Sequence, residues 1–465
     1  MNETKQTEAR ELLDLLELRQ YPAFMRRIDE WNPVDAAEFL SELPCERLPM
    51  VFRLLKKDTA AEVFAEMEPE QQSVIIEGMT DREIGSMLDD LFVDDAVDML
   101  EEMPAGIVKR IMKSATPETR AEINRFLAYP EDSAGSVMTS EFIDLKSEMT
   151  CQTAIEHIRQ HGLDKETVYV AYVTDTARVL TGVVPLKSLL FADPLTKIGD
   201  IMNEDVIFGY THDDREEVAN TISHYDILAL PIVDKEKRLV GLVTVDDALD
   251  VLETEATEDI EKMAAILPTD KPYMRTSVWE TYKKRIPWLL LLMISATFTG
   301  AIITHYESAI GTYAILTVFF PMLMDTGGNA GGQSSVTIIR GLSLGEIELR
   351  DVLRVLWKEI RVAAICGLTL AAATFIKVMV IDFRFQRLTV LENGDVQNNL
   401  LIAAIICITV FCAIIVAKIV GTLLPIGAKR IGLDPAVMAS PFITTIVDTV
   451  VLIIYFTIAS NILHF

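Results

Sequence analysis

Five apolar stretches, each long enough to cross a lipid bilayer, constrain the fold of this chain more than any other feature. The predicted helices are Pro287–Tyr306, Thr312–Ile339, Ile360–Ile381, Leu400–Leu424 and Pro441–Leu463. Each has at least the ~20 residues that span a hydrocarbon core about 30 Å thick. In lipid, every backbone polar group must be satisfied inside the segment, which favours helices. Residues 276–465 are therefore predicted to form an α-helical transmembrane domain.

Basic residues flank these stretches on one side of the predicted membrane. They precede the first stretch and lie between the second and third and between the fourth and fifth: Lys283, Lys284, Arg285, Arg340, Arg350, Arg354, Lys358, Lys429 and Arg430. Because Lys and Arg favour the cytoplasmic side, we expect a multi-pass protein of the plasma (inner) membrane. Its N-terminus is predicted to be cytoplasmic and its C-terminus extracytoplasmic. The first ten residues contain no apolar core, so no signal peptide is expected.

The charge of the chain is divided unequally. Residues 1–270 contain 57 Asp+Glu and 26 Lys+Arg, a net charge of −31, whereas residues 271–465 contain 12 and 16, a net charge of +4. An acidic soluble part disfavours nucleic acid and anionic lipid as its partners and suits cations. An acidic surface that only keeps the protein soluble is the alternative. The five cysteines form no C-x-x-C motif, which argues against a zinc site.

Residues 1–130 are predicted to be entirely helical. Similar segments end at Pro44, Pro69 and Pro104, and each has the spacing of a short amphipathic helix stopped by proline. A stack of such units forms a small superhelix in which neighbours bury each other's apolar faces. Several aspartates, including Asp94 and Asp95, gather around the third unit.

Residues 131–252 contain strands and an internal duplication. V-M-T-S-E-F-I at Val137 matches I-M-N-E-D-V-I at Ile201, and L-T-G-V-V-P-L at Leu180 matches L-V-G-L-V-T-V at Leu239. The order strand, helix, two strands, helix occurs twice and resembles a tandem pair of CBS domains, an α/β regulatory module. In nucleotide-binding members, the stretch matching G-L-V-T-V-D-D contacts ribose and phosphate. This resemblance implies Thr244 and Asp247 as candidate ATP contacts, although an empty structural module is the alternative.

An acidic segment, residues 247–275, connects this module to the membrane. Several of its acids share helix faces at three- or four-residue spacing, where like charges repel by a few tenths of a kcal/mol per pair. A divalent cation would relieve that repulsion, and a solvated connecting helix is the alternative.

The second apolar stretch contains a polar segment at Phe319–Ser335. It carries Pro321, Asp325, four glycines and two amides. An unpaired polar group in hydrocarbon costs several kcal/mol, so we expect a loosened backbone that lines an ion path. Close helix packing through small residues is the alternative.

Acids elsewhere in the membrane part extend this hypothesis. Asp448 lies in T-T-I-V-D-T-V-V, and Asp434 lies beside the predicted inner surface. A carboxylate inside a membrane is functional by default. Hard divalent cations prefer oxygen ligands, and Mg²⁺ keeps most of its waters. A proton relay, or a packing acid paired with Lys418, is the alternative for Asp448.

The combination of an acidic helical N-domain, CBS units, an acidic connecting helix and P-M-L-M-D-T-G-G-N-A-G-G-Q resembles the MgtE family of magnesium channels and transporters. The resemblance implies a homodimer with a pore on its two-fold axis. It places the central ion site at Asp448, an acid at the inner mouth at Asp434, and pore-lining positions at Gly328 and Asn329. Asp325 and Gly327 are further pore-lining candidates from the polar segment itself. The cytosolic Mg²⁺ ligands that it implies are Asp94, Asp95, Asp214, Glu216, Asp226, Asp247, Asp250, Glu255, Glu258 and Asp259. ATP at the CBS module is also implied, but Ile227 follows Asp226 where an aromatic residue would stack on adenine.

The sequence therefore predicts a Mg²⁺ channel or transporter that mediates uptake and is closed by cytosolic Mg²⁺. The chain contains no catalytic constellation, so no enzyme is expected. One alternative is a membrane-anchored sensor of Mg²⁺ or nucleotide without flux. Others are a transporter of Mn²⁺ or Co²⁺, or a CBS-regulated anion carrier, which the absence of an intramembrane Arg or Lys cluster disfavours.

Overall fold

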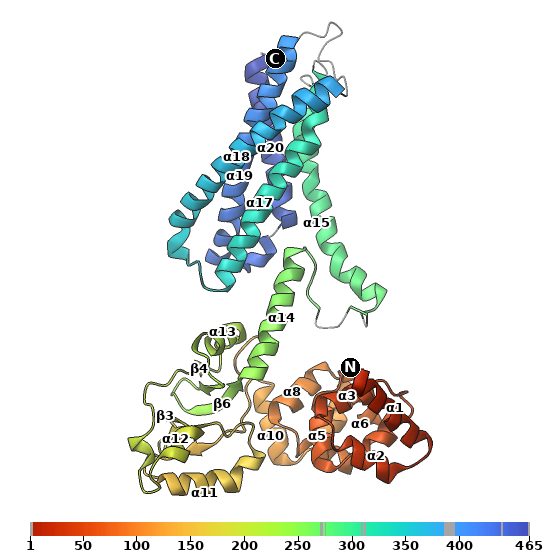
Figure 1. The fold of residues 1–465 in the computed structure, drawn as a ribbon, viewed down its shortest axis with the longest axis vertical. Helices are drawn as coiled ribbons and strands as arrows, with labels where there is room; N and C mark the ends of the chain where they lie inside the picture. The colour runs from red at the N-terminus through yellow and green to blue at the C-terminus, as the bar shows by residue number, and fades with distance from the viewer. Residues whose placement is uncertain are drawn as a thin grey trace. The chain divides into compact units, whose positions relative to one another are not determined.

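The computed structural model describes residues 3–269, 273–274, 276–307, 310, 313–385, 396–438 and 440–463. The chain divides into two compact units, Met1–Leu252 and Glu253–Phe465. The division falls inside helix α14, Val245–Met263 (Figure 1). Each unit has its own core and is described separately below.

The first unit begins with ten short helices. They are α1 (Glu3–Glu17), α2 (Tyr21–Ile28), α3 (Pro33–Ser41), α4 (Leu48–Phe52), α5 (Lys57–Ala65), α6 (Pro69–Gly78), α7 (Asp81–Leu88), α8 (Val93–Glu102), α9 (Ala105–Ser114) and α10 (Pro117–Phe126). From α3 to α8, each helix packs against the second helix after it. Ion pairs repeat at a spacing close to thirty residues and join successive layers, as in Arg53–Glu83 and Arg110–Asp81. These contacts confirm the predicted superhelix.

Two three-stranded sheets follow, with identical topology. The first contains β1 (Asp144–Leu145), β2 (Val170–Thr174) and β3 (Leu180–Pro185), and the second contains β4 (Gly209–Tyr210), β5 (Ala229–Val233) and β6 (Leu239–Thr244). In each sheet the first strand is parallel to the second, and the second is antiparallel to the third. Helices α11 (Cys151–His161), α12 (Leu186–Phe191) and α13 (Arg215–Tyr225) accompany the strands, and α14 follows β6. The predicted duplication is thereby confirmed.

The second unit is a helical bundle. Its helices are α15 (Val278–His305), α17 (Phe320–Ser343), α18 (Val352–Lys377), α19 (Val396–Arg430) and α20 (Ser440–Leu463). Short segments join them: the 3₁₀ segments η3 (Ala314–Phe319), η4 (Leu349–Asp351) and η6 (Pro435–Met438), and the π-helical η5 (Val378–Phe385). Helix α17 packs against both α19 and α20, and α15 packs against α20.

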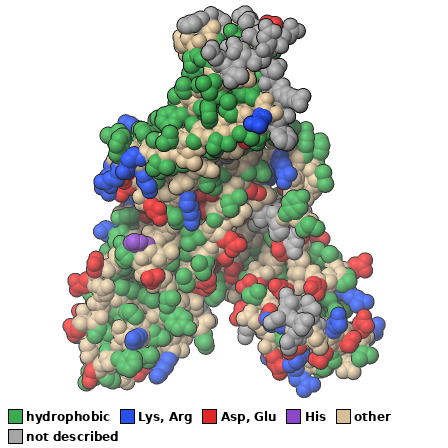
Figure 2. Space-filling view, turned by 45° about the horizontal axis from the view of Figure 1, so that its top comes forward, with side chains coloured by type: hydrophobic (Ala, Val, Ile, Leu, Met, Phe, Trp, Pro, Cys, Tyr) green, Lys and Arg blue, Asp and Glu red, His purple; other side chains and the backbone are tan. Residues whose placement is uncertain are grey.

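Within the described residues, four helical stretches are long and apolar enough to cross a membrane: Val278–His305, Leu349–Arg384, Asn399–Arg430 and Pro435–Leu463. The remaining long helix, α17, carries the polar residues of the predicted ion path. Several predicted helix ends were wrong. Helix α17 begins at Phe320 rather than Thr312, and α18 begins at Val352 rather than Ile360. Pro287 and Pro425 lie inside α15 and α19 rather than at their ends. Membrane helices tolerate proline when other groups satisfy the freed carbonyls. Hydrophobic side chains cover much of this unit, whereas acidic side chains gather on the first unit (Figure 2).

Candidate ion path and acidic clusters

Helix α17 is continuous through its polar segment. It begins after η3 with Pro321 in its first turn and is α-helical to Ser343. The expected loosened backbone is therefore wrong for Gly327–Gln333. Proline in the first turn costs no hydrogen bond, because the first N–H groups of a helix have no intrahelical partner.

The glycines of α17 permit close packing instead. A Cβ on Gly327 would lie 2.8 Å from Val451 of α20, and one on Gly328 would lie 2.8 Å from Thr444 of the same helix. On α19, a Cβ on Gly421 would lie 2.2 Å from the carbonyl oxygen of Gly331. The alternative interpretation, packing through small residues, accounts for these glycines.

The polar side chains of α17 lie on another face. Asp325, Asn329, Gln333 and Thr337 are exposed at four-residue spacing, so they form one stripe along the helix. A groove of about 580 Å³ runs along the stripe and is lined by Asn329, Gly332, Gln333, Val336 and Thr337. A stripe of polar side chains beside a groove on a membrane helix has the chemistry of a path for a hydrated ion.

Asp448 lies beside this face. It is half-buried in α20 and follows Val447, whose side chain packs against Gly327. Among the described residues, Asp448 Oδ1 has no hydrogen-bond partner although it is buried. Asp325 is close enough for its negative charge to repel the Asp448 carboxylate. Two carboxylates that repel each other, one of them unsatisfied, form a site that a cation would stabilise.

A second group of acids lies inside the first unit, and we call it the soluble acid cluster. Its core consists of Asp94 and Asp95 at the start of α8 and Asp247 at the start of α14, with Glu141 and Glu166 nearby. Burial, followed by the charges of neighbouring carboxylates, raises the pKa of Asp95 to about 6 and that of Glu166 to about 7. The same causes raise the pKa of Asp94 well above its usual value. Glu141 and Glu166 carried no sequence signal, because they come from separate segments.

The other predicted ligands of the first unit are not all gathered there. Asp250 lies near Glu66 instead. Burial, followed by the negative charge of Asp250, raises the pKa of Glu66. Asp214 caps the start of α13 and accepts a hydrogen bond from the Glu216 N–H at 2.8 Å, whereas Asp226 ends the same helix with a φ of 52°. At 1.5 Å per residue these two aspartates lie about 18 Å apart.

Among the described residues, no three His, Cys, Asp or Glu side chains are placed to hold one metal ion directly. Mg²⁺ keeps several of its waters when it binds protein. Binding through such waters needs wider spacing between carboxylates than direct coordination does.

Thr244 and Asp247 satisfy each other at the start of α14. The Thr244 hydroxyl donates to Asp247 Oδ2 at 2.5 Å, and the Asp247 N–H donates to the Thr244 hydroxyl at 3.4 Å. This is the capping arrangement of a helix N-terminus. The pair therefore has a structural role that needs no nucleotide.

The end of α14 meets Asp434 within the second unit. Lys262 Nζ lies 2.6 Å from Asp434 Oδ2 and also contacts Glu258. Burial would lower the pKa of Lys262, but hydrogen bonds to Asp434 and Glu258 outweigh burial and raise it. Burial, then the charge of Asp434, raises the pKa of Asp259, which also feels Glu255 and Glu258. Four predicted ligands, Glu255, Glu258, Asp259 and Asp434, thus share one neighbourhood.

A buried ion pair was missed by the sequence analysis. Lys418 of α19 is only 5% exposed and lies 3.5 Å from Glu359 of α18. Ser334 of α17 joins them, donating to Glu359 at 2.7 Å and accepting from Lys418 at 2.9 Å. The alternative in which Lys418 pairs with Asp448 is therefore wrong. The pair fixes α17 against both neighbours.

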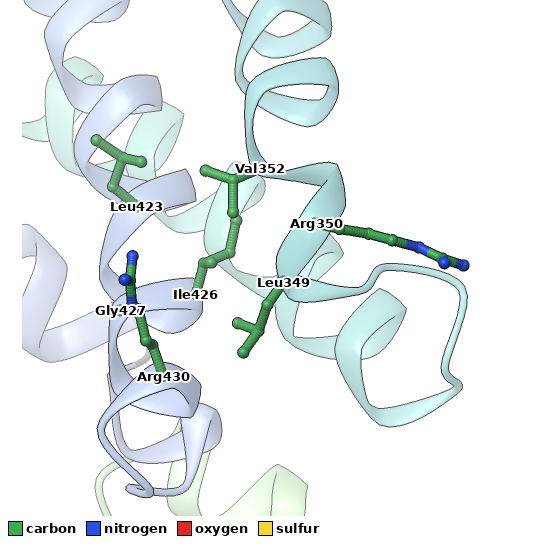
Figure 3. Close-up of a pocket in the computed structure, with 7 residues that line it drawn as sticks. All are labelled: Leu349, Arg350, Val352, Leu423, Ile426, Gly427 and Arg430. Atoms are coloured by element: carbon green, nitrogen blue, oxygen red, sulfur yellow. The ribbon is translucent and has the colours of Figure 1, made fainter.

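The start of α18, with η4 before it, and the last turns of α19 enclose a separate groove of about 530 Å³ (Figure 3). Apolar side chains line most of it, including Leu349, Val352, Leu423 and Ile426. Its charged residues are Arg350, which points away in Figure 3, and Arg430. An apolar groove with cationic residues does not suit a divalent cation, which excludes it as part of the ion path.

The soluble acid cluster predicts a specific pH dependence. Carboxyls whose pKa is raised by folding hold protons that the unfolded chain releases, so the stability they contribute is present at low pH and is lost as pH rises through about 6 to 7. In a chelator, the unfolding temperature of a soluble fragment should fall between pH 5 and pH 7.5. Millimolar Mg²⁺ should restore it at pH 7.5 and have little effect at pH 5.

Asp95→Asn is the control for this measurement, because it should flatten the pH dependence and weaken the effect of Mg²⁺. An unfolding temperature that rises between pH 5 and pH 7.5 in chelator would contradict the assignment.

Comparison with known proteins gives three matching family models. Residues 31–132 match the MgtE intracellular N domain, residues 198–254 match the CBS domain, and residues 320–458 match MgtE, a divalent cation transporter. The chain is 35% identical over 441 residues to the magnesium transporter MgtE of Thermus thermophilus, covering 94% of each chain. It is 30% identical over 446 residues to the magnesium transporter MgtE of Bacillus subtilis, covering 95% of this chain and 94% of the relative.

Solved structures match about half of the chain. The soluble part of a magnesium transporter aligns with a TM-score of 0.52 and 30% identity, over 54% of this chain and 99% of that one. The cytosolic domain of the Mg²⁺ channel MgtE in complex with ATP aligns with a TM-score of 0.50 and 37% identity, over 52% of this chain and 99% of that one.

Proposed function

Because this chain belongs to the MgtE family of magnesium transporters, we propose that it carries Mg²⁺ into the cell across the plasma membrane and that cytosolic Mg²⁺ closes it. It is a multi-pass membrane transporter and not an enzyme. The polar stripe of α17 beside the unsatisfied carboxylate of Asp448 is the observation that carries the proposal.

In this proposal, Asp448 forms the central ion site and attracts Mg²⁺ with most of its water shell. Asp325 adds a second charge, and the Asn329 amide supplies polar atoms to the hydrated ion. Gly327 and Gly328 act indirectly, because they bring α17 close enough to α20 for the two carboxylates to sense each other. Asp434 lies at the inner mouth of the path. In this orientation the N-terminus is cytoplasmic and the C-terminus is extracytoplasmic.

The same stripe supports the further proposal of a homodimer. Asp325, Asn329 and Gln333 are exposed on one protomer. Polar side chains left facing hydrocarbon are costly. A second copy of α17 placed opposite would close a polar channel between the two stripes and double its carboxylates, which supports a pore on the two-fold axis.

Gating in this proposal uses cytosolic Mg²⁺ as its ligand. The soluble acid cluster has excess negative charge that Mg²⁺ relieves. Asp214, Glu216, Asp226 and Asp250 are further proposed ligands of the first unit. A ligand shifts a two-state equilibrium only by its difference in affinity, so Mg²⁺ must bind the closed state more tightly. When cytosolic Mg²⁺ falls, carboxylate repulsion favours the open state.

Removal of residues 1–130 is predicted to weaken inhibition by cytosolic Mg²⁺, because it deletes Asp94 and Asp95 from the soluble acid cluster. Mg²⁺ uptake should then persist at internal Mg²⁺ concentrations that close the intact protein. The double variant Asp94→Asn/Asp95→Asn is a milder test of the same point. Inhibition unchanged in both would place the sensor elsewhere.

ATP is a further ligand that we propose for the CBS module, at Thr244 and Asp247. The relative crystallised with ATP supports it. The mutual capping of these two residues and the proximity of other acids to Asp247 oppose it. Binding of labelled ATP to the purified protein tests this proposal. ATP that binds the parent and binds Thr244→Val more weakly would support the site, and no binding to the parent would refute it.

Growth of a bacterial strain that lacks its own magnesium transporters tests transport directly. We expect expression of this chain to restore growth at low external Mg²⁺. A membrane-anchored sensor without flux, which is the competing function, would leave growth unrestored. Restored growth by Mn²⁺ or Co²⁺ uptake alone would instead identify another divalent cation as the substrate.

A further inference from the structure

Lys262 occupies an unusual place at the end of α14. Its ammonium lies 2.6 Å from Asp434, which directly precedes η6 in the same second unit. It also contacts Glu258 one turn earlier in its own helix. The side chains of Lys262 and Asp434 are 24% and 34% exposed, so the pair is partly shielded from water. Partial shielding strengthens such an interaction relative to a surface ion pair.

Packing on both sides fixes the position of this lysine. Met263, the next residue, packs against Ile339 of α17 and Ala436 of η6. Beyond the helix, the Leu267 N–H donates to the Lys284 carbonyl of α15 at 3.1 Å. The Thr269 N–H donates to Glu261 at 2.8 Å. The end of α14 is therefore seated on the membrane unit by apolar and polar contacts together.

Carboxylates from two elements lie near Lys262. Glu258, Asp259 and Asp434 act on one another electrostatically. Without a cation among them, these carboxylates would push α14 away from η6. An ammonium group has three N–H donors and a compact charge, so it can contact carboxylates from two elements at once.

We propose that Lys262 is a tethered cation that takes the place of a divalent ion at Asp434. It thereby seats the end of α14 at the inner mouth of the ion path without requiring a metal. An ion that passes Asp434 must displace the Lys262 ammonium, so Lys262 and a transported cation compete for the Asp434 carboxylate. The term inner mouth rests on the proposed function, whereas the contact itself does not.

A cross-linking experiment on the full chain tests this inference independently of transport. The substitutions Met263→Cys and Ala436→Cys report the seated helix by oxidative cross-linking, with the chain lacking both substitutions as background. In chelator, the parent with Lys262 should cross-link efficiently. Lys262→Met should cross-link roughly tenfold more slowly, since a hydrogen bond to a charged group is lost and carboxylate repulsion remains.

Two further measurements sharpen the result. Millimolar Mg²⁺ should restore cross-linking in Lys262→Met, because a divalent cation then supplies the missing charge, and this restoration also shows that the variant is folded. Lys262→Arg should behave like the parent, as should Lys283→Met, which removes an exposed lysine of the same unit. Equal cross-linking of Lys262→Met and the parent in chelator would overturn the proposal, as would loss that Mg²⁺ does not restore.

Mg²⁺ uptake into liposomes separates this inference from the proposed function. If the parent transports, Lys262→Met should show higher uptake than the parent when internal Mg²⁺ is removed, and Lys262→Arg should not. Uptake by Lys262→Met equal to the parent would overturn the competition between Lys262 and the transported ion. Absence of uptake by the parent would refute the proposed function, while the cross-linking result would still decide the role of Lys262.

Discussion

Replacement of Asp448 by asparagine is expected to lower Mg²⁺ uptake by at least about 100-fold while the protein stays folded. A charge about 4 Å away at an effective dielectric constant of ~20 contributes about 4 kcal/mol, and each 1.4 kcal/mol is a factor of ten. Asparagine keeps the shape of the side chain but removes its charge. Since Asp448 Oδ1 has no hydrogen-bond partner among the described residues, few contacts are lost. Uptake of Mg²⁺ into liposomes measures the effect.

Three variants control this experiment. Asp448→Glu should retain part of the uptake because it keeps the charge, and Asp325→Asn should lose less than Asp448→Asn because Asp325 is more exposed. Glu346→Gln, which neutralises an exposed acid of the same unit, should transport like the parent. Uptake by Asp448→Asn within a few-fold of the parent would remove Asp448 from the ion path.

Gly421→Ala is expected to have the largest effect on stability. The new methyl group would lie 2.2 Å from the Gly331 carbonyl oxygen, and neither backbone can move without separating α17 from α19. Overpacking typically costs about 1 to 3 kcal/mol, and a backbone contact places this site near the upper end. At about 2–4 °C per kcal/mol, the unfolding temperature should fall by about 6–12 °C. Uptake should fall as well, because the polar stripe moves with α17.

Gly427→Ala is a matched control on the same helix. Apart from the backbone of its own helix and its chain neighbours, no described heavy atom lies within 4 Å of the position that its new methyl group would take. Alanine should therefore be neutral or stabilise α19 by up to about 1 kcal/mol. A drop in unfolding temperature as large as that of Gly421→Ala would show that α19 rejects any side chain at a glycine. The close crossing at Gly331 would then lose its significance.

Local patterns predicted much of the fold. The proline-stopped repeats before residue 130 specified short stacked helices, and the two matching halves of residues 131–252 specified two equal sheets. In these patterns the spacing of apolar residues repeats within a single helix or strand, so each element can be predicted from its own residues. The helix ends at Pro287 and Pro425 were less predictable, because proline stops a helix in water more reliably than in a packed bundle.

The candidate site was only partly predictable, because its contacts join distant segments. The glycines after Pro321 indicated either a loosened backbone or close packing, and only the neighbours Val451, Thr444 and Gly421 distinguish the two. In the sequence, Glu359 and Lys418 lie at or near the ends of predicted helices, where charged side chains are common. In the structure they form a buried ion pair between α18 and α19.

The acids of the first unit show the same limit. Asp94, Asp95 and Asp247 were predicted as Mg²⁺ ligands from the family resemblance. Glu141 and Glu166 lie near them only because of the tertiary fold. Carboxylates from separate segments have no shared spacing that a sequence could reveal. The predicted boundaries at residues 130, 252 and 275 stay predictions, as do the individual ligands.

Mg²⁺ uptake by the purified protein in liposomes, at controlled Mg²⁺ on the side of the soluble unit, tests the central claim most directly. The proposal predicts uptake that is rapid when this Mg²⁺ is removed, falls as its concentration rises, and competes with Mn²⁺ and Co²⁺ to an extent that measures selectivity. Absence of Mg²⁺ uptake at every internal concentration, or uptake that does not respond to internal Mg²⁺, would contradict it.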